Sequence, residues 1–234
     1  EVFIHVSAKF SGNPRELFLA IKSRMIDSVT SINEEKVERG PTFLPENVGT
    51  FNPIHVGHVI IANHLVEHSD LDEIWMVVTP HNPHKKKSSL LANHHRLELV
   101  YLALQSYTKI KPSDIEFKLP QPNYTINTLA HINEKYPQHE FSLIMGEDNL
   151  KSFHKWKNFE TILENHHLYC YPRISEGEIK SNFNNHPKIH KIEAPIIELS
   201  ASLIRDGIKN KKNVVPMLPI ETWKYIDEMN FYRN

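Results

Sequence analysis

The sequence predicts an α/β protein with a Rossmann-like open parallel sheet and helices on both faces. From residue 48 onward, apolar runs of strand length alternate with helical segments, a pattern typical of parallel sheets. Two of the runs, at residues 73–79 and 141–145, are almost continuously apolar, as in strands buried on both faces. Because ligands of such sheets bind where the strands end, we expect the residues after each strand to carry the function.

The expected elements follow one another along the chain. Helices are expected over residues 58–67, 94–105, 125–135, 150–165, 201–209 and 220–229. Strands are expected over residues 73–79, 115–119, 141–145, 168–171 and 189–192. Residues 31–46 are polar and contain Gly40, Pro41 and Pro45, as linkers do. We therefore expect an N-terminal extension and linker at residues 1–47, of unassigned role, and one main domain at residues 48–234.

Composition narrows the classes of function. The chain has 27 Lys and Arg residues against 28 Asp and Glu residues, a net charge of −1, which disfavours a nucleic-acid binder. No stretch approaches the roughly 18 apolar residues of a membrane span, so we expect no membrane partner. The single cysteine, Cys170, excludes an internal disulfide and fits a cytoplasmic location. The sequence leaves open whether the chain forms a homo-oligomer.

The strongest motif is GTFNPIHVGH at residues 49–58, which leads into an apolar helix. It holds two of the seven glycines and two of the 16 histidines of the chain. Gly57 would let the helix start approach a ligand, and helix-start amides favour a phosphate. His55 and His58 would lie there and stabilise the charge of a transferring group. The alternative is a plain turn with incidental histidines, which the concentration of such residues disfavours.

Two further segments follow expected strands. Lys85, in the sequence PHK at residues 83–85, could meet a phosphate, and the alternative is a solvated basic loop. Gly146 ends a buried run, so that the backbone there could approach a nucleotide. Asp148 could accept hydrogen bonds from a ribose, or simply cap a helix.

Polar and aromatic residues also mark the starts of later segments. Ser200 and Ser202 begin a helix that carries Arg205, and this combination of amides, hydroxyls and guanidinium fits a pair of phosphates. Trp156 could stack on a flat ring, or belong to the core at helical spacing with Phe153 and Phe159.

The order and spacing of these segments resemble those of the nucleotidyltransferase superfamily, and in particular the bacterial nicotinate mononucleotide adenylyltransferases. Residues 49–58 are similar to the signature G-x-F-x-P-x-H-x-G-H, and residues 83–85 to P-H-K. Residues 146–150 with Trp156 are similar to G-x-D-x-L…W. Residues 199–205 are similar to I-S-x-T-x-x-R, with Leu199 and Ser202 replacing Ile and Thr. The resemblance extends over about residues 48–234.

The resemblance implies transfer of an adenylyl group from ATP to nicotinate mononucleotide in NAD biosynthesis, with pyrophosphate and nicotinate adenine dinucleotide as products. It implies His55, His58 and Arg205 as catalytic residues and Mg²⁺ bound mainly through the ATP phosphates, with no metal ligands from the chain. The residues implied to contact ATP are Gly49, Thr50, Phe51, Gly57, Gly146, Asp148, Ser200 and Ser202. Those implied to contact nicotinate mononucleotide are Asn52, Lys85, Tyr124, Thr125 and Trp156.

Two other functions stay open. One is a related enzyme acting on another phosphate, such as pantetheine phosphate, and the other is a nucleotide-binding module without turnover. The second arises because family members open with a buried strand directly before the signature, whereas residues 43–48 here contain Pro45 and two polar residues. Either that strand is short and irregular, or a distant piece such as residues 2–6 takes its place.

Several other residues invite simpler interpretations. His64 and His68 are spaced like metal ligands, but no carboxylate or cysteine pattern completes a site. Arg96, near the start of an expected helix, is as well explained by a salt bridge as by function. The pairs His94–His95 and His166–His167 are expected on the surface.

Overall fold

The computed structural model describes residues 49–80, 90–173, 183 and 185–233, together with the backbone of two short strands, β1 (Ser7–Ala8) and β2 (Thr42–Phe43). β1 and β2 pair in antiparallel fashion. The remaining strands all pair in parallel: β3 (Ile74–Val77), β4 (Ile110–Ser113), β5 (Leu143–Gly146), β6 (Leu168–Tyr171) and β7 (Ile189–Lys191). The helices are α2 (Val56–His68), α3 (Asn93–Leu104), α4 (Thr125–Lys135), α5 (Glu147–Leu150), α6 (Phe159–Asn165), α7 (Ala201–Lys209) and α8 (Ile220–Glu228).

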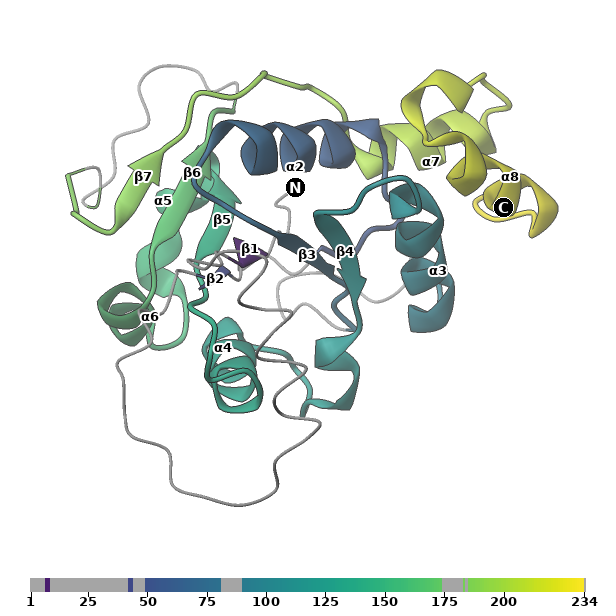
Figure 1. The fold of residues 1–234 in the computed structure, drawn as a ribbon. Coiled ribbons are helices and arrows are strands. Elements are labelled where there is room, and N and C mark those ends of the chain that lie inside the picture. Colours follow the sequence, from purple (N-terminus) through teal and green to yellow (C-terminus); the bar gives the residue numbers. More distant parts are fainter. Residues whose placement is uncertain are drawn as a thin grey trace, which may run out of the picture.

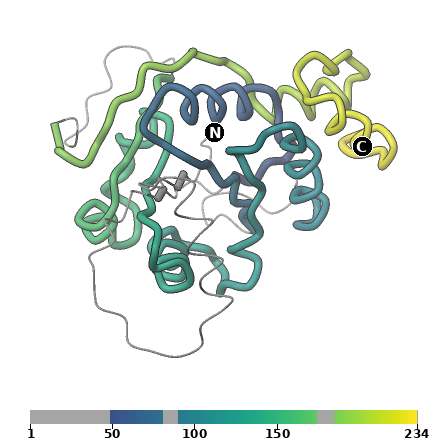
Figure 2. Tube along the Cα trace, in the orientation of Figure 1, coloured from purple at the N-terminus to yellow at the C-terminus, as the bar shows by residue number. Residues whose placement is uncertain are grey.

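Helices cover the parallel strands from two sides, as expected. Figure 1 shows α2 on one side of the strands and α4 on the other. The C-terminal helices α7 and α8 lie beyond α2 at the right of the view, and Figure 2 follows the chain into them. α8 packs on α3, where the Thr222 hydroxyl donates to the Leu99 carbonyl at 3.3 Å.

The parallel strands form two groups, where the sequence predicts one sheet. β3 pairs with β4, and β5, β6 and β7 pair in that order. Gly49 forms a parallel bridge with Val78, so the signature segment begins beside the end of β3. In Figure 1, β1 and β2 lie between the two groups, and β1 contacts β3. Of the two candidates for the first strand, residues 2–6 lie outside the described residues, and so do residues 43–48 except for Phe43, which belongs to β2.

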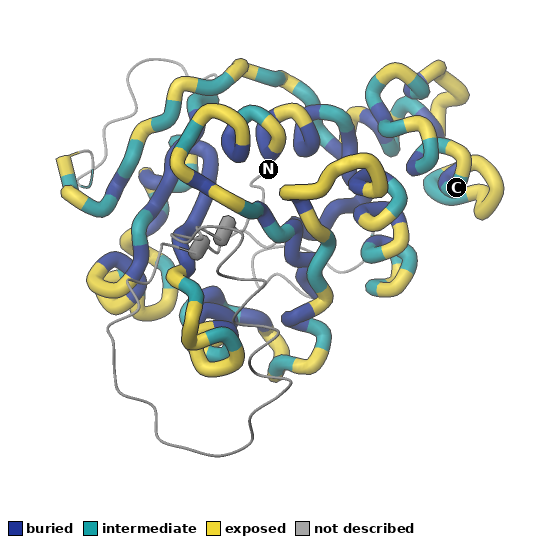
Figure 3. The backbone as a smooth tube through the Cα atoms, viewed as in Figure 1, coloured by how far each residue is buried: buried dark blue, intermediate teal, exposed yellow. Residues whose placement is uncertain are grey.

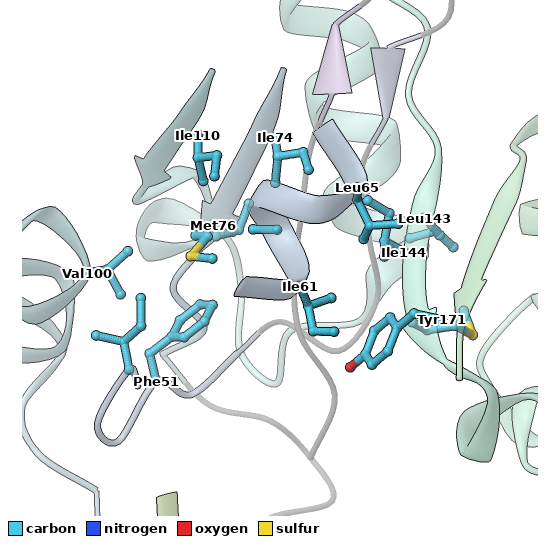
Figure 4. Close-up of a cluster of buried hydrophobic side chains, with 14 of the residues drawn as sticks. Phe51, Ile61, Leu65, Ile74, Met76, Val100, Ile110, Leu143, Ile144 and Tyr171 are labelled. Carbon is cyan, nitrogen blue, oxygen red and sulfur yellow. The ribbon is translucent and has the colours of Figure 1, made fainter. Parts of the chain in front are cut away.

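One apolar core joins the two groups of strands. Ile61 and Leu65 of α2 lie between Ile74 of β3 and Ile144 of β5 (Figure 4), and all four side chains are at most 2 % exposed. Figure 3 shows the same arrangement along the chain, with buried stretches on the strands and on the inward side of α2. Burying each such side chain is worth roughly 1.5–3 kcal/mol, so α2 holds the two halves together.

Two of the predicted elements are wrong. The strand expected at residues 115–119 is a 3-10 helix over Ile115–Lys118, and the strand lies earlier, at β4. β4 reads Ile-Lys-Pro-Ser and has no apolar alternation, because among the described strands it pairs with β3 alone, and an edge strand tolerates a proline.

The single helix expected at residues 150–165 is broken into α5, a 3-10 turn at Phe153–Lys155, and α6. It breaks because Trp156 is extended and Asn158 adopts a left-handed conformation, with φ of 54°.

One histidine expected on the surface is buried. His166 is 6 % exposed, and its Nδ1 is hydrogen-bonded to the Phe141 carbonyl. It follows α6 directly and packs beside β5, and burial lowers the pKa of its ring below the usual value. Its surface placement was inferred from the polar residue type alone, which says nothing about a partner 25 residues away.

Candidate active site

The signature segment makes a tight turn at the end of β3. Phe51 has a φ of 41°, and its ring lies over Gly49. A Cβ atom on Gly49 would come within 2.5 Å of that ring, so only glycine fits. The Gly49 carbonyl accepts a hydrogen bond from the Thr79 amide at 3.3 Å, which ties the turn to the strand.

The two signature histidines stack at the start of α2. Their ring centroids are 3.7 Å apart and the rings are inclined by 25°; His55 is fully buried and His58 is 4 % exposed. The backbone amide of His55 donates to Nδ1 of His58 at 2.8 Å. Since Nδ1 accepts, the neutral ring of His58 carries its proton on Nε2, and that nitrogen is a hydrogen-bond donor.

The start of α7 docks on the signature segment. Arg205 donates from Nη1 to the Asn52 carbonyl at 2.7 Å and from Nη2 to the Ser202 hydroxyl at 3.0 Å. The Ser200 hydroxyl caps the helix by accepting from the Leu203 amide at 3.2 Å. Arg205, with Ser202 bonded to it, therefore lies next to the signature, although Arg205 and Asn52 are 153 residues apart in sequence.

A cavity of about 360 Å³ lies beside the α7 start. The residues that line it are Asp148, Arg173, Ile197, Glu198, Leu199, Ser200 and Leu203. Nε of Arg173 is 4.0 Å from Oδ1 of Asp148. A Cβ on Gly146 would come within 2.4 Å of that carboxylate and 2.9 Å of the Arg173 side chain, so glycine is needed here too. The volume suits a small ligand of nucleoside size.

The α2 start adjoins this cavity. Gly57 lies with Arg173, Ile197 and Leu199 around a smaller neighbouring pocket. A Cβ on Gly57 would be 3.1 Å from the His55 ring and 3.2 Å from Ile197. We call residues 49–58, the α7 start and this cavity the nucleotide side.

A second cluster surrounds the start of α4. Thr125 is the first residue of the helix and is buried, and Tyr124 precedes it. The Nζ atom of Lys157 lies 4.6 Å from the centre of the Tyr124 ring, which brings the segment after Trp156 against the α4 start. Trp156 is half-buried and packs edge-on against Phe153 at 5.0 Å. We call residues 123–128 and Trp156 the pyridine side, after the ring that the resemblance implies there.

Lys85 lies outside the described residues. Of the other predicted residues, those assigned to ATP or to catalysis gather on the nucleotide side, and Tyr124, Thr125 and Trp156 gather on the pyridine side. Asn52 lies between the Arg205 guanidinium and the C-terminal segment.

Two residues near the site were missed by the sequence interpretation. Arg173 is the second residue after β6, so the expectation that functional residues follow each strand points to it. Tyr232 donates to Oδ1 of Asn52 at 3.0 Å, and no sequence pattern marks it. Burial raises the pKa of Tyr232 above its usual value, although the charges of Arg205 and Arg96 oppose this.

Arg96 is neither a surface salt bridge nor a ligand-facing residue. It is fully buried, and Nη1 donates to the carbonyls of Thr50 at 2.6 Å and Thr79 at 2.8 Å. Nε donates to the Leu91 carbonyl at 3.0 Å. Burial lowers its pKa to about 10, so it stays charged at neutral pH. It clamps the signature turn to the end of β3.

No cluster of three or more His, Cys, Asp or Glu side chains that could hold a metal ion occurs in the described part of the chain. His64 and His68 have their rings 4.5 Å apart, and Nε2 of His64 is hydrogen-bonded to the Glu193 carbonyl at 2.8 Å. None of the helices within the described ranges combines the length and apolar character that crossing a membrane requires.

The profile of the cytidylyltransferase-like family matches residues 47–207. A protein of Christiangramia forsetii named "Probable nicotinate-nucleotide adenylyltransferase" is 68 % identical over 185 residues, which are 79 % of this chain and 95 % of the relative. The chain belongs to the nicotinate-nucleotide adenylyltransferases. A relative of the same name in Flavobacterium psychrophilum is 65 % identical, over 79 % of this chain and 96 % of its own length.

Solved structures share the fold of this adenylyltransferase. The nicotinic acid mononucleotide adenylyltransferase of Plasmodium falciparum, complexed with NaAD, superimposes with a TM-score of 0.66 at 21 % identity. The match covers 79 % of this chain and 94 % of that one. The predicted family and the predicted α/β fold class are thereby confirmed.

Proposed function

We propose that the chain transfers the adenylyl group of ATP to the 5′-phosphate of nicotinate mononucleotide. A phosphate oxygen of the mononucleotide attacks the α-phosphorus in line, the bond from that phosphorus to the bridging oxygen of the β-phosphate breaks, and pyrophosphate leaves. The observation that carries the proposal is the meeting of the α2 and α7 starts, with His58 and Arg205, beside the cavity that holds Asp148. Membership of the adenylyltransferase family supports it.

On the nucleotide side, charge stabilisation is the main task. The Nε2 proton of His58 donates to a non-bridging oxygen of the reacting phosphate. The backbone amide of His55 fixes that tautomer of His58, and the His55 ring stacks on the His58 ring and keeps it in place. Arg205, with Ser200 and Ser202, holds the β- and γ-phosphates. Because no covalent intermediate is needed, catalysis consists of positioning and charge stabilisation.

The remainder of ATP occupies the 360 Å³ cavity in this proposal. Asp148 accepts hydrogen bonds from the ribose hydroxyls, and the absence of a side chain at Gly146 lets the nucleoside approach. The backbone of Gly49, Thr50 and Phe51 and the helix start at Gly57 line the path of the phosphates. Arg173, across from Asp148, adds a cation near the nucleotide.

The pyridine side receives nicotinate mononucleotide. The backbone amides at Tyr124 and Thr125 point out of the α4 start, where donors and helix dipole favour the ring carboxylate. Trp156 stacks on the ring, and Lys85 and Asn52 contact the mononucleotide. Residues 123–128 contain no Asp or Glu that could accept the amide group of a carboxamide ring.

A divalent metal fits the nucleotide side only when ATP is present. The charged and imidazole side chains there are those of two histidines, two arginines (Arg173 and Arg205), Asp148 and Glu198, and the described residues contain no carboxylate cage. Mg²⁺ suits this setting, since it keeps several waters and binds through substrate phosphates with few protein ligands. When bound, it would supply positive charge that neutralises part of the phosphate charge.

We further propose that residues 48–234 are the catalytic unit and residues 1–47 an extension; the family profile begins at residue 47. A cytoplasmic location fits the buried thiol of Cys170. Thermal melting of a chain lacking residues 1–40 tests this division: the shortened protein should keep a cooperative transition.

Pyrophosphate release tests the proposed function. ATP and Mg²⁺ are incubated with nicotinate mononucleotide, nicotinamide mononucleotide or pantetheine phosphate, and ATP alone gives the background. We expect the highest kcat/KM with nicotinate mononucleotide. A higher value with pantetheine phosphate would show a related enzyme, and release at background with every acceptor would show a binding module.

A further inference from the structure

Glu116 is a fully buried carboxyl group that the mechanism above does not use. It lies in the 3-10 helix between β4 and α4. Burial raises the pKa of its carboxyl group to about 7, although hydrogen bonds from two threonines oppose this. No basic side chain of the described residues forms an ion pair with it. Since a carboxyl group in such a place is costly for stability, its retention calls for another explanation.

The carboxyl group of Glu116 joins two parts of the active site. Oε1 accepts from the Thr128 hydroxyl at 2.7 Å, and Oε2 accepts from the Thr79 hydroxyl at 3.0 Å. The backbone carbonyl of Glu116 also accepts from the Asn123 amide nitrogen at 3.3 Å. All three partners are at most 5 % exposed, so water does not compete for these bonds.

One end of this bridge fixes the start of α4. Thr128 lies in the first turn, and its backbone amide donates to the Tyr124 carbonyl at 3.2 Å. The Thr125 hydroxyl and the Asn123 side-chain carbonyl are buried and have no hydrogen-bond partner among the described residues. Buried polar atoms left in this state are rare and call for an explanation, and a ligand bound at the α4 start would supply their partners.

The other end fixes the end of β3 and, through it, the signature turn. The amide of Thr79 donates to the Gly49 carbonyl at 3.3 Å, and its carbonyl accepts from Arg96 at 2.8 Å. Arg96 also holds the Thr50 carbonyl. A continuous set of buried hydrogen bonds therefore runs from the signature turn to the α4 start.

We propose that Glu116 is a positioning residue for the pyridine side, which sets the distance and direction of the α4-start amides relative to the signature turn. Its role is to hold the donors that receive the ring carboxylate, and thereby to maintain the preference for an acidic ring over its amide. The inference rests on the proposed function, because it assigns the acid-binding donors to the α4 start.

The test compares Glu116→Leu and Glu116→Gln with the wild type. Gln keeps the shape and can hydrogen-bond to both hydroxyls, which rotate to donate or accept. Leu removes both bonds. Glu134→Leu, at an exposed carboxylate on α4, is the matched control. For each protein, kcat and KM are measured for ATP, nicotinate mononucleotide and nicotinamide mononucleotide.

We expect Glu116→Leu to raise the KM for nicotinate mononucleotide at least about tenfold, with the KM for ATP changed less than about twofold. The ratio of kcat/KM for acid over amide should fall to within about threefold of one. Glu116→Gln and Glu134→Leu should stay within about threefold of the wild type in all constants.

Equal rises in both KM values, or an unchanged acid-to-amide ratio in Glu116→Leu, would overturn the inference. If Glu116→Leu does not fold, Thr128→Val takes its place, since it removes only the hydroxyl group on α4. It should raise the KM for nicotinate mononucleotide more than the KM for ATP, by a smaller factor than Glu116→Leu. A wild type that does not adenylylate nicotinate mononucleotide overturns the proposed function, and the inference with it. A wild type with normal acid preference and a Leu variant that keeps it overturns the inference alone.

Discussion

The nucleotide side and the pyridine side are built in different ways. On the nucleotide side, the chemistry we propose resides in side chains: His58 and Arg205 come from two helix starts and lie against one tight turn. On the pyridine side, the donors we assign are backbone amides at the start of α4, and buried groups such as Glu116 hold that start in place. The proposed nucleotide side therefore depends on which side chains are present, whereas the proposed pyridine side depends on where the α4 backbone is held.

Removal of a signature histidine should affect the nucleotide side alone. We expect His58→Ala or His55→Ala to lower kcat by roughly 10²–10³, about 2.7–4 kcal/mol of transition-state stabilisation. The ratio of kcat/KM between acid and amide substrates should change little, because the α4 start is untouched. Steady-state kinetics with both substrates measures the two quantities together.

The control for these variants is His94→Ala, at an exposed histidine on α3. Since His55 and His58 are buried, thermal melting must show that each variant is folded at the assay temperature. Turnover near that of the wild type would remove the histidine from the mechanism. A collapse of the acid preference would show that the two sides are not separate.

The pH dependence of stability tests the pyridine side without any substrate. The folded-state pKa of Glu116 is about 7, against 4.5 for an ordinary glutamate. The folded protein therefore keeps this proton while the unfolded chain loses it, and stability falls as pH rises from about 4.5 to about 7. The difference of about 2.5 pKa units corresponds to about 3 kcal/mol.

Urea unfolding of wild type and Glu116→Gln at pH 5 and pH 8 measures this effect. Histidines such as His166, whose pKa burial lowers, contribute a rise of stability with pH, but equally in both proteins. The wild type should therefore lose about 2.5 kcal/mol more stability than the variant between pH 5 and pH 8, since part of the effect is already present at pH 5. An equal change in the free energy of unfolding of both proteins between pH 5 and pH 8 would show that Glu116 is not held in an apolar setting.

Much of the fold could be predicted, because its periodic segments are strongly patterned. α4, β6 and α7 have the predicted bounds, and α7 is marked by the Ser200 cap. β4 was missed because a proline and two polar residues hide an edge strand. The parallel pairing was predicted, but the described parallel strands form two groups instead of one sheet.

The site divides in the same manner. The signature and the Arg205 segment could be proposed from the sequence, because the residue types that suit phosphate binding lie within a few positions of one another in each segment. The bridge from Thr79 through Glu116 to Thr128 could not, because its members are 37 and 12 residues apart and each is an ordinary residue alone. Tyr232 reaches Asn52 over 180 residues, and only the fold brings them together.

The most direct measurement compares nicotinate and nicotinamide mononucleotide as substrates of the wild type at saturating ATP. A ring carboxylate gains charge-assisted hydrogen bonds from the α4-start amides, whereas a carboxamide turns its own donors toward them. We predict a kcat/KM at least about tenfold higher for the acid, on the order of 1.4 kcal/mol. Equal values, or a preference for the amide, would contradict the assignment of the pyridine side.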